Sequence, residues 1–197
     1  WPEEYSETEV AMAWRYFRQD LVRRPVRMDD GDDRVFCDNS RDPKAGDGAG
    51  ILIQIPHDFF AGEAKRLGFD LPAAGDYGVG FVFMPRDPAV RERIEQIFDK
   101  AAAEENLEVL GWRDVPVDSS VLGESVKPTE PFHRQVFVAR GPNFKDTDPQ
   151  SFARKLFVMR KVVSNRVTSI RDTDCSGYYI VSMSPDTIVY KGLVLGM

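Results

Sequence analysis

The sequence predicts a mixed fold of helices and strands, α+β or α/β, packed in layers around a core. Short apolar or alternating segments, such as residues 50–55 and 77–84, are typical of strands. Longer segments with apolar residues at helical spacing, such as residues 88–105, are typical of helices with one buried face. A chain of 197 residues, 42% hydrophobic and 29% charged, is long enough for one soluble globular domain.

The first 47 residues predict a helix followed by a polar connector. Ser6 and Glu9 have the spacing of a capping box, and Pro25 ends the helix predicted over residues 6–24. Residues 26–47 are rich in Asp and predict a loop, with room for a short strand near residues 35–36. Four close carboxylates raise a calcium hypothesis, but the EF-hand spacing is absent, which favours a solvated acidic loop; they are Asp29, Asp30, Asp32 and Asp33.

The stretch from Gly46 to Pro56 combines three glycines with the apolar run of residues 51–55. This pattern predicts a tight loop that enters a buried strand. A phosphate-binding loop is the alternative, but the Gly-Lys-Ser/Thr ending of a P-loop is missing, so a structural loop is favoured. For Asp47, a carboxylate that accepts backbone N–H bonds is favoured over a direct substrate contact.

Helices and strands alternate through the middle of the chain. A helix over residues 57–67 precedes strand 77–84, where Val79, Phe81 and Phe83 share one face. Asp87 and Pro88 predict an N-cap and a first helical residue. The helix that follows runs to about Glu105 and is expected to bury Val90, Ile94, Ile97 and Ala101.

Two more strands and a helix are expected after residue 107. The strands cover residues 109–112 and 134–139, separated by a long loop over residues 118–131. Asp148 and Pro149 repeat the cap and proline of the earlier helix, and the helix reaches about residue 170. Its six cations could attract an acid, but a solvated outer face is favoured; they are Arg154, Lys155, Arg160, Lys161, Arg166 and Arg171.

The chain is expected to close with a β-hairpin. Strand 178–183 and strand 187–191 are joined by a turn that contains Pro185. The apolar residues 192–197 have no polar cap, which predicts a domain that is incomplete at the C-terminus and needs self-association or a partner chain to cover its apolar faces.

Charge and targeting signals narrow the class of protein. A net charge of −6 argues against nucleic acid or an anionic membrane as partner, and no apolar run approaches a membrane span. The N-terminus has no signal-peptide pattern, so a cytoplasmic, reducing location is expected. Two cysteines, Cys37 and Cys175, imply no disulfide framework, and neither pairs with His57 or His133 at zinc-site spacing, so no metal is expected.

Five segments carry a resemblance to a known family, in fixed order: residues 46–57, 77–88, 109–118, 155–161 and 178–192. Together they resemble the class II glutamine amidotransferase domain of the large subunit of glutamate synthase. The resemblance covers about residues 42–192 and leaves residues 1–41, the helix and acidic loop, divergent. It implies the four-layer αββα sandwich of N-terminal-nucleophile hydrolases and hydrolysis of L-glutamine to L-glutamate and ammonia. FMN and an iron–sulfur cluster are implied only for a full-length glutamate synthase, and no cofactor for this domain.

The resembled family attacks glutamine with an N-terminal Cys whose own α-amine is the base. This chain starts with Trp1, has Val-Phe-Cys at residues 35–37 where the family has His-Arg-Gly, and would place the family's Arg-Phe-Ser-Thr-Asn and Asn-Gly-Glu motifs beyond Met197. No catalytic or substrate-binding residue is therefore assigned. Cys37 and Ser6 are internal and lack the free α-amine, and Ser6 is explained by its capping box.

The remaining candidates have structural explanations. Cys175 is expected to be a buried or half-buried inert thiol, and no motif supports a Cys–His dyad with His57 or His133. Stacking or surface anchoring is expected for Trp112 and Arg113. The sequence thus predicts a single, partial amidotransferase domain over residues 1–197 that is inactive alone. A non-catalytic interaction or regulatory module and a recombined sequence are the alternatives.

Overall fold

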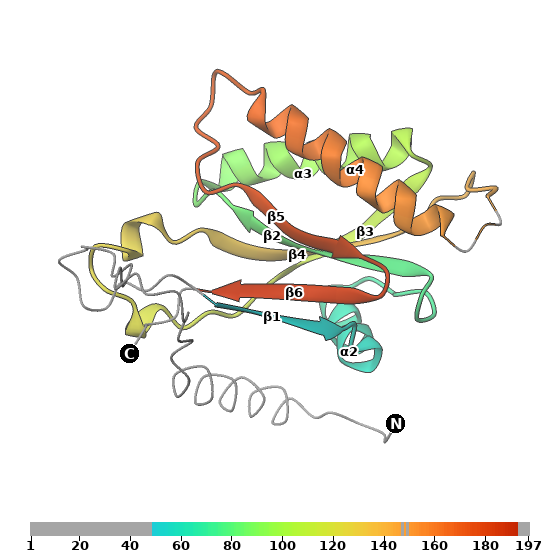
Figure 1. The fold of residues 1–197 in the computed structure, drawn as a ribbon, viewed down its shortest axis with the longest axis horizontal. Helices are drawn as coiled ribbons and strands as arrows, with labels where there is room; N and C mark the ends of the chain where they lie inside the picture. The colour runs from blue at the N-terminus through green and yellow to red at the C-terminus, as the bar shows by residue number, and fades with distance from the viewer. Residues whose placement is uncertain (1–48, 147, 149, 193–197) are drawn as a thin grey trace, which may run out of the picture.

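A computed structural model describes residues 49–146, 148 and 150–192, which form two antiparallel sheets and three α-helices (Figure 1). Expectations for residues 1–48, for Pro149 and for residues 193–197 lie outside this range. Two short 3₁₀ helices, η1 (Ser119–Val121) and η2 (Lys127–Thr129), lie in the loop expected over residues 118–131. The main elements are β1 (Ala49–Gln54), α2 (His57–Leu67), β2 (Tyr77–Met84), α3 (Pro88–Glu104), β3 (Leu107–Asp114), β4 (Phe132–Arg140), α4 (Ser151–Thr168), β5 (Tyr179–Ser184) and β6 (Thr187–Gly192).

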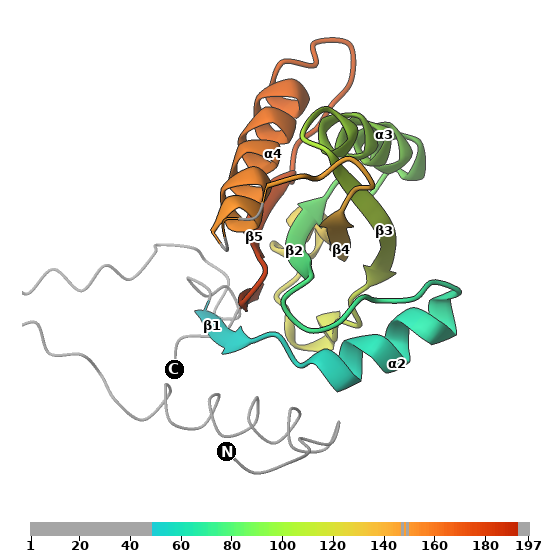
Figure 2. The ribbon, with the colours of Figure 1, turned by 90° about the vertical axis from the view of Figure 1, so that its right-hand side faces the viewer.

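The described elements stack in three layers. The middle layer is a four-stranded sheet in the order β3-β4-β2-β5. Helices α3 and α4 cover one face of this sheet, and the pair β1-β6 lies on its other side together with α2 (Figures 1 and 2). A helical layer followed by two sheets is the arrangement that an αββα sandwich requires for its first three layers.

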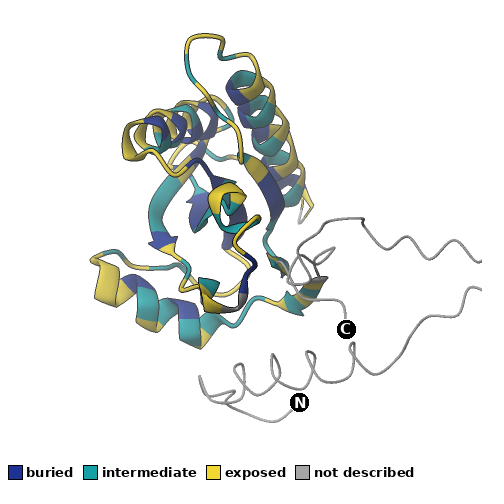
Figure 3. Cartoon of the chain, turned by 90° about the vertical axis from the view of Figure 1, so that its left-hand side faces the viewer, coloured by how far each residue is buried: buried dark blue, intermediate teal, exposed yellow. Residues whose placement is uncertain are grey.

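Two apolar clusters fill the spaces between these layers. Alternation along β2 sends Val82 and Met84 toward the helices and Val79 and Phe81 toward the second sheet, so each face of the strand serves a different cluster. Figure 3 shows buried residues on the four-stranded sheet and on the sides of α3 and α4 that face it. The expected shared face of Val79, Phe81 and Phe83 is confirmed.

The last two strands do not form the expected hairpin. β5 pairs with β2 in the four-stranded sheet, whereas β6 pairs with β1 in the other sheet. The chain therefore crosses from one sheet to the next at residues 185–186. The Ser182 hydroxyl accepts a hydrogen bond from the Val189 N–H at 3.0 Å and so replaces a ladder contact at this corner. Sequence alternation is the same for a hairpin and for a strand that changes sheet, which explains the error.

Most element bounds agree with the sequence, and three details differ. The N-cap of α4 is Gln150, two residues later than expected, although the Asp148 carboxylate accepts the Gln150 N–H at 2.9 Å. Helix α3 buries Phe98, whereas Ile97, which was expected to be buried, is only partly buried. Leu52 in the strand expected to be buried is 64% exposed, because only one face of β1 packs on the core.

Candidate functional site

The space between the two sheets contains a chain of hydrogen-bonded polar side chains, which we call the inter-sheet polar chain. It consists of Glu63 on α2, Arg113 on β3, Gln135 on β4 and Tyr190 on β6. Arg113 Nε donates to Glu63 Oε2 at 2.7 Å, and Arg113 Nη1 donates to Gln135 Oε1 at 3.1 Å. Gln135 Nε2 donates to the Tyr190 hydroxyl at 2.7 Å. The chain thus connects both sheets and one helix.

Strand register explains why these side chains meet. Arg113 is the direct partner of Gln135 in the antiparallel pair β3-β4, so both side chains project from the same face. Gln135 is fully buried and Arg113 is 8% exposed. Of the two expectations for Arg113, surface anchoring is therefore wrong, whereas stacking agrees with the position of its guanidinium over the Phe59 ring. The one sequence signal was that Gln135 lies two residues before Phe137 and therefore on the same face of the strand as this inward-facing side chain.

The chemistry of the inter-sheet polar chain is structural. Burial raises the pKa of Tyr190, so its hydroxyl stays neutral and accepts from Gln135. The buried Arg113 charge is paired with the Glu63 carboxylate, and its guanidinium lies 5.2 Å from the centre of the Phe59 ring. These polar groups satisfy one another, and none of the four is a side chain that attacks an amide.

The two histidines lie at opposite ends of β2 and do not meet. His57 begins α2, and its Nδ1 lies 3.2 Å from the hydroxyl of Tyr77 at the start of β2. His133 on β4 pairs with Phe83 near the end of β2. Tyr77 and Phe83 are six positions apart along the strand, which corresponds to roughly 20 Å. The two imidazoles therefore cannot serve one reaction centre.

Cys175 lies on the other side of the sheet from the inter-sheet polar chain, in the connection between α4 and β5. It is half-buried, its thiol is free, and it packs against the helix-side cluster. Burial raises the pKa of the thiol, which reduces the fraction of reactive thiolate at neutral pH. The expected half-burial of Cys175 is confirmed. A dyad with either histidine has no geometric support in the described residues.

The cations of α4 divide into outward and anchored side chains, so a uniformly solvated face is wrong. Arg154 and Lys161 are exposed, but Arg160 Nη2 donates to the Ile180 carbonyl of β5 at 2.8 Å.

Trp112 stacks edge-on against Phe98, with ring centres 4.9 Å apart, as expected.

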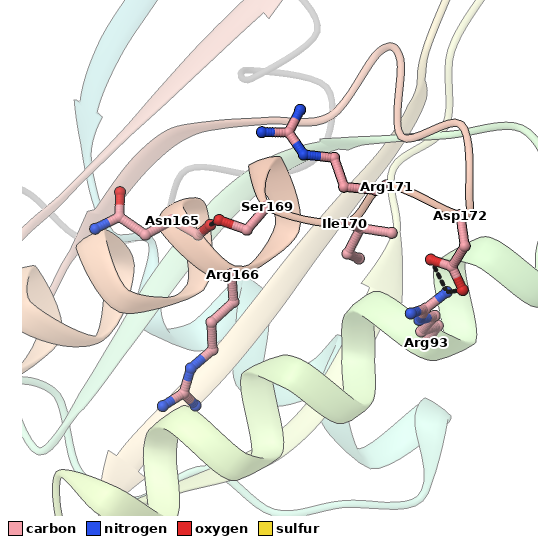
Figure 4. Close-up of a pocket in the computed structure, with 7 residues that line it drawn as sticks. All are labelled: Arg93, Asn165, Arg166, Ser169, Ile170, Arg171 and Asp172. Carbon is pink, nitrogen blue, oxygen red and sulfur yellow. Dashed lines mark hydrogen bonds and ion pairs between the residues drawn. The ribbon is translucent and has the colours of Figure 1, made fainter.

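A shallow pocket of about 540 Å³ lies beyond the end of α4 (Figure 4). Two of its three arginines already have carboxylate partners, because Arg93 donates to Asp172 and Arg166 donates to Glu104. Near the C-terminal end of a helix, the macrodipole also disfavours an anion. This pocket is not a candidate site for an anionic ligand.

Two global features complete the description of the site. No group of three or more His, Cys, Asp or Glu side chains in the described residues could hold a metal ion. None of the described helices is long and apolar enough to cross a bilayer.

Comparisons with known proteins give a consistent result. A family described as "Glutamine amidotransferases class-II" matches residues 37–197. The chain is similar to the large chain of NADPH glutamate synthase from Bacillus subtilis, with 42% identity over 78% of this chain and 10% of the relative. It is also similar to ferredoxin-dependent glutamate synthase 2 from Arabidopsis thaliana, 38% identical over 78% of this chain and 9% of the relative. NADH glutamate synthase from Saccharomyces cerevisiae is 38% identical over 75% of this chain and 7% of the relative. The chain therefore spans at most a tenth of the length of these relatives.

Proposed function

Because the chain belongs to the class-II glutamine amidotransferases, we propose that it is part of a domain that hydrolyses L-glutamine to L-glutamate and ammonia for glutamate synthesis. The family match over residues 37–197 carries this proposal. The stacked sheets support it, because they match the architecture that the resemblance implies. We place this activity in the cytoplasm, and assign residues 1–197 to a single domain.

The described residues act as a scaffold in this proposal. Amide hydrolysis needs a nucleophile beside a base and donors for the oxyanion. Cys175 has a raised pKa and lies in the helix-side cluster, while Tyr77 and Tyr190 are neutral phenols held by burial. We therefore assign no catalytic, substrate-binding or metal-binding residue and no cofactor to this chain. FMN and the iron–sulfur cluster belong to the remainder of a full-length synthase.

A glutaminase assay tests the proposal for this chain. Purified protein is mixed with L-glutamine and ammonia release is measured. We expect no release above the protein-free blank, because no thiol among the described residues has a base beside it. Treatment with an electrophilic glutamine analogue followed by mass spectrometry should leave Cys37 and Cys175 unmodified. Turnover above blank, or a saturable adduct on either thiol, would contradict the assignment.

An interaction module on the same scaffold is the second candidate. Leu52 on β1 is 64% exposed and Phe157 on α4 is 56% exposed, so apolar side chains face outward on two elements. We expect self-association or binding of a partner chain that covers them. Sedimentation velocity should then show concentration-dependent assembly, which Leu52→Gln reduces. A monomer at all concentrations that binds no hydrophobic dye argues against this candidate.

A further inference from the structure

A second cavity, of about 310 Å³, lies at the start of β4. It is bounded by the turn that leads into α3, by the segment after β3 and by the loop before β4. The lining residues that matter here are Arg86, Arg91, Val117, Glu130, Phe132 and His133. This volume is at the lower end of the range for small-molecule sites, which begins at about 300 Å³.

The two arginines of this cavity are held in place by backbone carbonyls. Arg86 donates from Nε to the Glu130 carbonyl at 2.7 Å and from Nη2 to the Lys127 carbonyl at 2.6 Å. Arg91 Nη1 donates to the Pro85 carbonyl at 3.0 Å, and its guanidinium lies 4.1 Å from the centre of the Phe132 ring. Since both groups are anchored, a ligand would not have to order them.

Both guanidinium groups keep unused N–H donors. Within the described residues, Arg86 Nη1 and Arg91 Nε and Nη2 have no hydrogen-bond acceptor. Of the described residues that line the cavity, Glu130 is the one carboxylate, and it already accepts from the Ser119 hydroxyl at 2.8 Å and from Arg86 at 3.3 Å. Among the lining residues, two arginines face one glutamate, which leaves an excess of one positive charge in the lining.

His133 adds a polar atom without a partner. Its ring stacks on Phe81 with centres 5.9 Å apart and meets Phe83 edge-on at 4.9 Å, so its orientation is fixed. Its Nδ1 is buried and has no hydrogen-bond partner in the described structure. Because this nitrogen is closed off from solvent, the ring reports on charge in the cavity and is not itself a group that binds the ligand. Burial also lowers the pKa of His133, so the ring is neutral at pH 7.

We infer that this cavity binds a small monocarboxylate with a short apolar chain, of the size of propionate or butyrate. The planar carboxylate accepts from the free guanidinium N–H groups, which have the fork geometry that carboxylates match. A single negative charge balances the single positive excess. Val117 and Phe132 provide apolar surface for the hydrocarbon end.

The direct test is an NMR titration of the full chain with propionate. The chain has two histidines, so the His57 ring is an internal reference for His133. We expect saturable shifts of the His133 ring signals with a Kd of about 1 mM and an increase in the pKa of His133, because a bound anion favours imidazolium. Propionamide, the neutral isostere, should produce neither effect. Equal shifts at both histidines, or equal binding of propionamide, would overturn the inference.

Two matched variants locate the site. Val117 is 53% exposed and lines the cavity, so Val117→Asp should fold normally and weaken propionate binding by about fivefold through charge repulsion. Val158→Asp introduces the same charge on the outer face of α4, where Val158 is 39% exposed, and should leave binding unchanged. Equal affinities of the two variants would show that propionate binds elsewhere. Tighter binding of inorganic phosphate than of propionate would show that the cavity prefers a different anion and would overturn the assignment to a carboxylate.

Discussion

Arg113 shows how much depends on one buried charge between the sheets. It hydrogen-bonds to Glu63 on α2 and to Gln135 on β4, and its side chain is only 10% exposed. Removing it would leave Glu63 Oε2 and Gln135 Oε1 without the donor that they share in the space between the sheets. Such losses cost far more than the pair itself contributes, because the desolvation of the remaining group is not recovered.

We therefore predict that Arg113→Met lowers the free energy of unfolding by about 2–4 kcal/mol, measured by urea denaturation. Arg66 contacts the same Glu63 carboxylate, but its side chain is 75% exposed. Arg66→Met is the matched control and should change stability by less than about 0.5 kcal/mol. Similar losses of stability in both variants would mean that burial does not make the Arg113–Glu63 contact more important for stability than the exposed Arg66–Glu63 contact.

At the scale of elements, close packing between α4 and the four-stranded sheet constrains β2. A Cβ added at Gly78 would lie 2.5 Å from Leu156 Cδ1, and Leu156 is fully buried. Gly62 in α2 is the opposite case, because an added Cβ meets nothing within 4 Å. The close approach of α4 therefore requires a glycine at position 78, whereas position 62 has no such requirement.

Gly78→Ala should therefore destabilise the protein by about 1–3 kcal/mol through overpacking. Thermal or urea unfolding measures the loss. Combining it with Leu156→Ala makes room for the new methyl group. The double variant should then lose at least about 0.5 kcal/mol less than the sum of the single losses. Additive losses would exclude a clash with Leu156 as the cause.

Gly62→Ala should instead stabilise the protein by about 0.5–1 kcal/mol, because alanine has the higher helix propensity and no contact opposes it. The comparison uses the same unfolding measurement as the β2 variant. A loss of stability would indicate that the position needs glycine for a contact outside the described residues.

For the whole molecule, buried phenols connect stability to pH. Burial raises the pKa of Tyr77 to about 12, and it also raises the pKa of Tyr190 and Tyr178. The folded state therefore binds these protons more tightly than the unfolded chain, whose tyrosines titrate near pH 10. Their contribution to stability is complete below pH 10 and is lost as pH rises from 10 toward the folded pKa.

We predict a fall in the free energy of unfolding between about pH 10 and pH 12, and a fall at least about 1 kcal/mol smaller in Tyr77→Phe. The variant also loses the hydroxyl contact with His57, so the slope with pH and not the absolute stability is the readout. Tyr179→Phe, at a ring that is 50% exposed, is the control and should keep the wild-type slope. An unchanged slope in Tyr77→Phe would contradict the linkage.

Local signals were strong enough to predict most elements. Helix α2 and strand β2 have the expected bounds, and Asp87 with Pro88 caps α3 as expected, with the Asp87 carboxylate accepting the Ala89 N–H at 2.9 Å. These features depend on alternation, helical spacing and capping chemistry, which act over a few neighbouring residues. The sequence therefore determined the elements, the layered fold class and the family resemblance.

Only the tertiary structure decided which surfaces and sheets these elements join. It placed β6 opposite β1 and not beside β5, buried Arg113 against Glu63, and brought His133 to a cavity lined by two arginines. Each of these depends on contacts between residues far apart in the chain. Strand alternation and residue type are identical for the alternatives, so no local pattern distinguishes them.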